Sequence, residues 1–137
     1  MDDRTINLGK GQTLRVLASS AETLELESTW VGTGKRPPSH RHPRQDERFE
    51  VLTGQLSVEL DGGPLRELRA GDTLHVPRGT AHRMWNGGPD TTRALWRVTP
   101  ALRTEEMFRF IGGGLSPLRI ATLLWRHRNE YRLRLGR

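Results

Sequence analysis

The sequence contains no cysteine. This absence excludes disulfide bonds, thiolate metal ligands and a cysteine nucleophile, so any metal site must use nitrogen and oxygen donors. Long apolar runs are also missing, because the longest one, around residues 120–125, is far too short to span a bilayer. The first residues carry acids where a secretory signal carries bases. We therefore expect a soluble cytoplasmic protein without a transmembrane segment.

The positive charge of the chain is concentrated near its end. With 137 residues the chain has the length of one domain with its own core. The net charge is +6, but residues 115–137 hold six arginines and one glutamate, while the preceding residues hold 16 basic and 15 acidic side chains. The excess therefore belongs to the tail. Because a helix-turn-helix pattern is also missing, we predict no nucleic-acid partner.

Several short segments alternate apolar and polar residues, as strands with one buried face do. They cover residues 12–31 with a break near 19–22, residues 55–60, a strand ending near 68, and residues 91–99. The glycine-containing stretches 61–63 and 86–90 separate them as turns. Many short strands with no early helix predict an all-β sandwich or barrel.

Helical signals begin only at Thr104, which is predicted as an N-cap before a helix that ends at glycines 112–114. A second helix is predicted from Ser116, with proline at its first position, to about Leu133. Its apolar stripe contains Ile120, Leu123, Leu124, His127 and Tyr131. We thus divide the chain into a barrel, residues 1–103, and a helical extension, residues 104–137. The extension is expected to pack on the barrel or a partner subunit, with contact to an anionic membrane surface as the alternative.

The first candidate site combines two histidines and a glutamate. His40 and His42 are two residues apart, so an extended strand places both imidazoles on one face. Pro43 interrupts strand pairing, after which Glu47 can begin a new strand that faces back toward the histidines. Glu50 falls on the opposite face of that strand and is the poorer ligand candidate.

The second candidate block contains His82. Pro77 and Gly79 predict a tight turn that reverses the chain just before this histidine, which can then approach the others from a neighbouring strand. His75 lies between two apolar residues and should face outward. A metal ion shared by imidazoles and a carboxylate is one interpretation, and histidines that only form structural hydrogen bonds are the other.

The two blocks together resemble the motifs of the cupin family. The first block reads Gly34, five residues, His40-x-His42, four residues, Glu47, six residues, Gly54. The second reads Gly71, five residues, Pro77-x-Gly79, two residues, His82, three residues, Asn86. The resemblance covers residues 34–86 with no position missing. It implies a double-stranded β-helix, or jelly roll. We assign six residues of the two blocks to turns and not to chemistry: Gly54, Gly71, Asp72, Pro77, Gly79 and Asn86.

The resemblance also implies a metal centre. By analogy His40, His42, Glu47 and His82 would bind one divalent transition metal: iron, manganese, nickel, zinc, copper or cobalt. It further implies a homodimer. Four protein ligands leave open positions on a six-coordinate ion for a small molecule.

By strand parity the pocket wall would consist of Leu26, Ser28, Trp30, Phe49, Met84 and Trp96, which could equally fill the barrel as core. We therefore predict a metal-dependent enzyme acting on a small apolar or aromatic molecule that carries a ligating oxygen, with dioxygenase-like oxidation as the first reaction. An isomerase or cyclase, and a non-catalytic module that binds or senses a small ligand, are the alternatives. A general acid or base beyond the ligands cannot be named.

Overall fold

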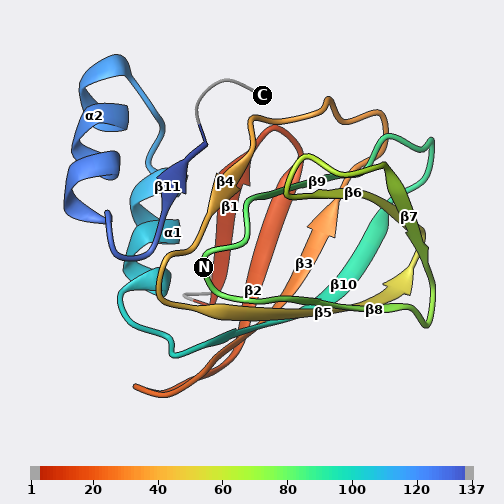
Figure 1. Ribbon diagram of the computed structural model, residues 1–137, viewed down its shortest axis with the longest axis horizontal. Helices are drawn as coiled ribbons and strands as arrows, with labels where there is room; N and C mark the ends of the chain where they lie inside the picture. Colours follow the sequence, from red (N-terminus) through yellow and green to blue (C-terminus); the bar gives the residue numbers. More distant parts are fainter. Residues whose placement is uncertain (1–3, 135–137) are drawn as a thin grey trace.

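Two antiparallel sheets form most of the computed structural model, which describes residues 4–134 (Figure 1). The first sheet has the order β1-β2-β3-β10-β5-β8 and comprises β1 (Thr5–Gly9), β2 (Gln12–Ser19), β3 (Leu24–Trp30), β10 (Thr92–Thr99), β5 (Asp46–Thr53) and β8 (Thr73–Val76). The second has the order β11-β4-β9-β6-β7 and comprises β11 (Arg132–Leu133), β4 (His40–Arg41), β9 (His82–Trp85), β6 (Gln55–Leu60) and β7 (Arg66–Arg69). The helices are α1 (Thr104–Gly112) and α2 (Pro117–Arg126). The predicted all-β jelly roll with two C-terminal helices is confirmed.

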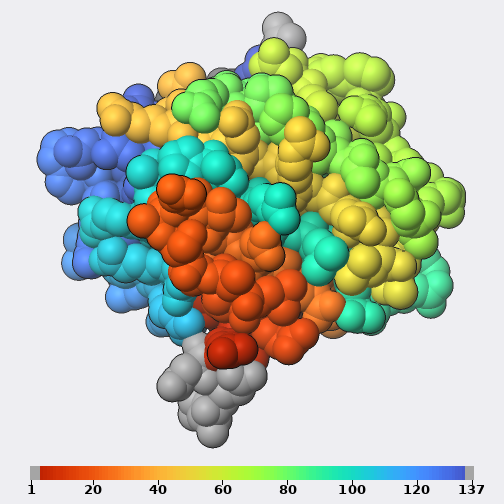
Figure 2. All heavy atoms as spheres, turned by 90° about the horizontal axis from the view of Figure 1, so that it is seen from below, coloured from red at the N-terminus to blue at the C-terminus, as the bar shows by residue number. Residues whose placement is uncertain are grey.

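The interior contains two buried apolar clusters. One comprises Trp30, Phe49, Val51, Leu56, Val58, Leu68, Leu74, Val76 and Ala94. The other comprises Ile6, Leu14, Val16, Leu24, Leu26, Val98, Ala101, Met107, Phe108 and Leu123, and so joins both helices to the first strands. Figure 2 shows this side of the molecule, with the orange surface of the early strands beside the cyan and blue helices. The helices therefore extend the barrel's core at one end.

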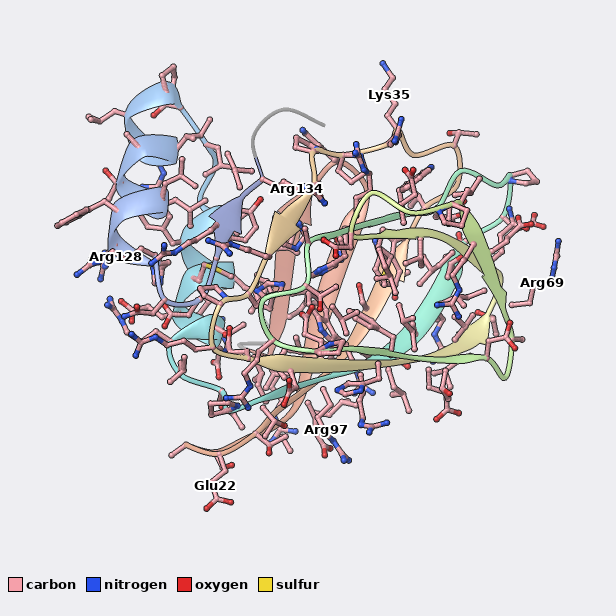
Figure 3. All side chains as sticks on the ribbon, viewed as in Figure 1. Glu22, Lys35, Arg69, Arg97, Arg128 and Arg134 are labelled. Atoms are coloured by element: carbon pink, nitrogen blue, oxygen red, sulfur yellow. The ribbon has the colours of Figure 1, made fainter. Side chains whose placement is uncertain are left out.

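The strand alternation expected from the sequence is present. In β5, Glu47, Phe49 and Val51 are buried, whereas Arg48 and Glu50 are exposed. The outward side chains include Arg97, which points away from the first sheet in Figure 3 and pairs with Glu25 at 2.8 Å. Charged side chains thus cover the outer face of this sheet and apolar ones fill its inner face.

Three details of the chain differ from the sequence-based predictions. The second helix ends at Arg126 and not near Leu133, because the chain turns at residues 127–130 and forms β11. Thr104 is the first helical residue and Arg103 the N-cap; the Thr104 hydroxyl instead accepts a hydrogen bond from the Gln45 amide at 2.6 Å. The strand β1 was not predicted.

Some predictions concern residues outside the described range. The acidic start, used above against a secretory signal, and the last three residues of the predicted extension lie outside residues 4–134. Neither helix of the described chain has the length and apolarity needed to cross a membrane.

Two residues of the recognised blocks shape the chain as predicted. Gly54 links β5 to β6 with a φ of +81°, and a Cβ there would lie 2.4 Å from the Thr92 hydroxyl oxygen. A larger residue would therefore be both strained and obstructed. Asn86 is buried, and its amide nitrogen donates to the carbonyl oxygens of Trp30, Val31 and Asp90. It holds the loop before β10 to the end of β3.

The core assignment predicts a stability difference between two leucines. Leu26 is fully buried, so we expect Leu26→Ala to lower the free energy of unfolding by about 2–5 kcal/mol through lost burial and the cavity left behind. Leu118, which is 77% exposed, is the matched control, and its replacement by alanine should change stability by no more than about 0.5 kcal/mol. Urea denaturation measures both. Equal stabilities for the two variants would contradict the packing described for Leu26.

Candidate metal centre

Three histidines and one glutamate meet between the two sheets. His40 and His82 lie directly opposite each other on β4 and β9. His42 follows β4, where its carbonyl oxygen accepts a hydrogen bond from the amide of Gly79, 2.8 Å away. Glu47 comes from β5 in the other sheet. The structure therefore brings together all four predicted residues.

The imidazole rings are close enough to share one ion. One potential ligand nitrogen on each of His40, His42 and His82 can be chosen so that all lie within 4.8 Å of one another. Nε2 of His42 and Nε2 of His82 each lie 3.2 Å from the same carboxylate oxygen, Oε1 of Glu47. His42, His82 and Glu47 are buried, whereas His40 is partly exposed. Side chains from both sheets thus point at one small volume.

Main-chain carbonyl groups fix the outer side of the rings. Nδ1 of His42 lies 2.6 Å from the carbonyl oxygen of Glu130, and Nδ1 of His82 lies 3.1 Å from that of Thr80. A carbonyl oxygen only accepts hydrogen bonds, so each Nδ1 must carry the proton. In the neutral ring Nε2 is then unprotonated and directs its lone pair toward Glu47, which is the tautomer that a metal ligand needs.

The Glu47 carboxylate is a buried charge. Burial by itself would raise its pKa, but the neighbouring His42 and His82 outweigh burial and hold the pKa of Glu47 well below its usual range. Its second oxygen, Oε2, accepts a hydrogen bond from the indole nitrogen of Trp96 at 2.8 Å. Glu47 is therefore an oriented anion and not a neutral carboxylic acid.

The two first-block histidines differ in charge preference. Burial, reinforced by His82 and His42, holds the pKa of His40 well below its usual value. Burial also acts to lower the pKa of His42, but the adjacent Glu47 carboxylate outweighs it and the pKa of His42 is raised. His40 thus favours the neutral form, whereas the Glu47 carboxylate favours the protonated form of His42.

Unsatisfied polar atoms test whether a metal ion fits this arrangement. Nε2 of His42 and Oε1 of Glu47 are both completely buried and face each other at 3.2 Å, without a hydrogen bond of good geometry. Buried polar atoms without a partner are costly, by about 1–3 kcal/mol each. A divalent cation would satisfy both atoms at once, so nitrogen and oxygen donors of this kind fit a transition metal.

The predicted pocket residues all lie on inward-facing positions but are not equivalent. Leu26, Ser28, Trp30 and Phe49 are buried in the interior, whereas Met84 and Trp96 are partly exposed. The Ser28 hydroxyl accepts a hydrogen bond from the side chain of Gln12 at 2.9 Å. Trp96 and Phe49 stack with ring centroids 5.2 Å apart. Of the six, Met84 and Trp96 retain surface that a small molecule could contact.

Two titratable residues near the motifs lie away from the site, as predicted. His75 on β8 and Glu50 on β5 are both exposed on the outer side of the first sheet. Neither belongs to the group of potential ligands.

Sequence reasoning missed the residues that support the ligands from outside. Trp96 was predicted as pocket wall, and its hydrogen bond to Glu47 was not foreseen. Glu130 and Tyr131 contact His42 and His40, but were assigned to a helix. Two signals could have revealed this segment: Asn129, a common helix-terminating residue, and the alternation of polar and apolar residues from 130 to 134.

Comparison with known proteins agrees with this architecture. The family described as Cupin domain matches residues 29–98, which contain all four site residues. The polyketide synthase CurC of Streptomyces cyaneus is 32% identical over 99 residues, covering 69% of this chain and 63% of that protein. The polyketide cyclase RemF from Streptomyces resistomycificus, whose structure is known, is 26% identical in sequence, and the two structures superpose with a TM-score of 0.59 over 66% of each chain.

A further relative carries an oxidoreductase name. The probable oxidoreductase yanE of Aspergillus niger is 43% identical over 61 residues. That match covers 44% of this chain but 23% of the relative. The chain thus spans about a quarter of the length of this larger protein.

The geometry predicts that His42 is essential for metal binding. His42→Ala removes one of the converging donors, so we expect the protein purified without added metal or chelator to lose its metal while the barrel stays folded. His75→Ala, an exposed histidine, should keep the wild-type metal content. Elemental analysis and circular dichroism measure the two properties. Full metal occupancy in His42→Ala would contradict the assignment.

The hydrogen bond to Glu47 predicts an effect of Trp96. Trp96→Phe keeps an aromatic ring but removes the donor to Oε2, so the carboxylate loses its orientation, and metal affinity should fall by about 10- to 100-fold. Trp125→Phe is the control, because Trp125 is 70% exposed on α2. Calorimetric titration with Co²⁺ compares the variants. Equal affinities would show that this hydrogen bond does not position Glu47 for metal binding.

Proposed function

The chain belongs to the cupin domain family, and from this premise we propose that it is a metal-dependent enzyme acting on a small aromatic molecule that carries a ligating oxygen. The observation that supports this most directly is the convergence of His42 Nε2 and His82 Nε2 on one buried oxygen of Glu47, with His40 beside them.

The proposed ligands are His40, His42, Glu47 and His82. Imidazole and carboxylate donors suit divalent iron, manganese, nickel, zinc, copper or cobalt. Three neutral imidazoles and one carboxylate leave a dication with a net charge of about +1, which favours an anionic or enolic substrate oxygen. When bound, the ion would supply Lewis-acid activation of that oxygen and, if it is iron, redox chemistry.

The remaining residues orient and shield the centre. Trp96 holds the Glu47 carboxylate, and the carbonyl groups of Glu130 and Thr80 hold two imidazoles in one tautomer. Met84 and Trp96 offer a thioether and an indole surface to an aromatic substrate. The buried aromatic interior behind them keeps water away, which strengthens electrostatic interactions at the reacting oxygen.

Oxidation is the first reaction that we propose, with a dioxygenase-like use of molecular oxygen as its specific form. The similarity to yanE, a probable oxidoreductase, supports oxidation in general. That similarity is confined to a quarter of the relative's length, so the reaction of the larger protein transfers only as a proposal.

Ring closure or isomerisation of a polyketide-type substrate is the second candidate. It is favoured by the extent of the similarity, because CurC and RemF both match about two thirds of this chain. The same centre could perform this reaction without oxygen by stabilising an enolate, since negative charge develops on an oxygen that the cation faces. A sensor or binding module that performs no reaction is the remaining alternative.

One experiment separates these functions. The protein is loaded in turn with each candidate metal and incubated with enolisable β-dicarbonyl aromatic compounds, while oxygen consumption and product mass are followed. Oxygen uptake with gain of oxygen atoms supports oxidation, whereas loss of water without uptake supports cyclisation. Binding without any product supports a sensor. His42→Ala should be inactive, and equal turnover by this variant would refute a metal-dependent reaction.

A further inference from the structure

The chain returns to the barrel after α2, in a segment outside the residues that match the family. Residues 127–133, which we call the C-terminal strap, follow α2 and end in β11. In β11, Leu133 lies opposite His40 and Arg132 opposite Arg41. The next residue, Arg134, donates its amide to the carbonyl oxygen of Ser39 at 3.0 Å. Figure 1 shows β11 beside β4, so the strap forms the edge of the sheet that carries His40.

The strap contacts both histidines of the first block. The carbonyl oxygen of Glu130 accepts the Nδ1 hydrogen of His42 at 2.6 Å. The ring of Tyr131 stacks on the imidazole of His40, with centroids 4.8 Å apart and planes inclined by 22°. The strap thus contacts His42 at its Nδ1 atom and His40 on the face of its ring.

A buried hydrogen bond between two side chains stabilises the conformation of the strap. His127 is fully buried, and its Nδ1 lies 3.3 Å from Oε1 of Glu130, which is also buried. The amides of Glu130 and Tyr131 both donate to the carbonyl oxygen of His127, at 3.0 and 2.9 Å. These contacts form a tight turn that directs the Glu130 carbonyl group toward His42. The contact of the Glu130 side chain with His127 thus supports the turn that positions the Glu130 carbonyl group.

Arg134 ties the end of the strap to the barrel. Its guanidinium group lies 3.3 Å from the Asp61 carboxylate in the turn after β6. In Figure 3, Arg134 points toward the barrel, while Arg128 near the start of the strap points away from it. The strap is thus attached at both ends, by the helix at one and by β4 and Arg134 at the other.

We propose that the C-terminal strap completes the metal centre: the Glu130 carbonyl group orients His42, and Tyr131 holds His40. This inference rests on the proposed metal site. Hydrogen-bond partners of ligating histidines fix the tautomer and ring orientation, and their loss weakens metal binding by about 10- to 100-fold. Glu130 and Tyr131 are therefore positioning residues supplied from outside the matched family region.

Tyr131 lies between His40 and a hollow on the surface. Its other surroundings form an open hollow of about 400 Å³ lined by Leu124, Trp125, Arg128, Tyr131, Arg132 and Leu133. His40, on the inner side, is the partly exposed member of the four proposed ligands. Removing the ring should open the centre toward this hollow, so a bound ion should leave faster as well as bind more weakly.

Cobalt binding to the full chain tests this proposal. We expect Glu130→Ala and Tyr131→Ala to bind Co²⁺ about 10- to 100-fold more weakly. Both should show altered Co²⁺ absorption bands, and Tyr131→Ala should release the ion faster to a chromogenic chelator. Tyr131→Phe keeps the stacked ring and should restore wild-type behaviour. Asn129→Ala, an exposed residue of the same turn, is the matched control.

The results distinguish failure of the proposal for the strap from failure of the proposed metal site. Unchanged affinity and absorption bands in both alanine variants would refute the role of the strap, even if their melting temperatures fell. Should Glu130→Ala fail to fold, the comparison of Tyr131→Ala with Tyr131→Phe decides by the same measurements. Failure of the wild-type protein to bind Co²⁺ or any other candidate metal would instead refute the proposed function.

Discussion

The buried carboxylate of Glu47 is the constraint on which the site depends. An isolated charge in a protein interior is very unfavourable unless positive charge and hydrogen bonds surround it. Glu47 is 1% exposed, and it meets this requirement through Trp96, His42 and His82. Burial acts against a charge on His42, but the adjacent Glu47 carboxylate outweighs it and raises the pKa of this histidine, so the carboxylate favours a proton on the imidazole. A metal ion would take over the same electrostatic role and release that proton.

The sequence contained the local part of this arrangement. The spacing of His40 and His42 places both imidazoles on one face, and the break after Pro43 explains why Glu47 can face them from a new strand. Both constraints act within a few residues, so they could be predicted. The approach of His82 required the turn at residues 77–79 and the pairing of β9 with β4, which the motif order supported and the structure now shows.

The long-range part could not be predicted from the same signals. The stripe through Leu123, His127 and Tyr131 has helical spacing, and these residues do face inward, but they do so on a helix followed by a turn. The helix ends at Arg126, and the turn that follows brings the buried side chains of His127 and Glu130 into contact. Tertiary contacts of this kind override a local periodic pattern.

The arginines near the C-terminal end of the sequence also take part in tertiary contacts. Arg126 pairs with Glu106, and Arg134 pairs with Asp61, so part of the positive charge of this segment contributes to the fold.

If the C-terminal strap completes the metal centre as proposed, metal binding is coupled to how well residues 127–133 are ordered. The strap has a two-residue strand, a single His–Glu pair and one ring stack, so its local opening should cost much less free energy than unfolding the barrel. A metal ion that binds only when the strap is packed on the barrel stabilises this packed form by mass action. Such coupling is reciprocal. A molecule that binds in the hollow beside Tyr131 and orders the strap would therefore raise the metal affinity, although it contacts none of the four proposed metal ligands. In the proposed centre the barrel would supply the donor atoms, and the strap would determine how firmly they are held.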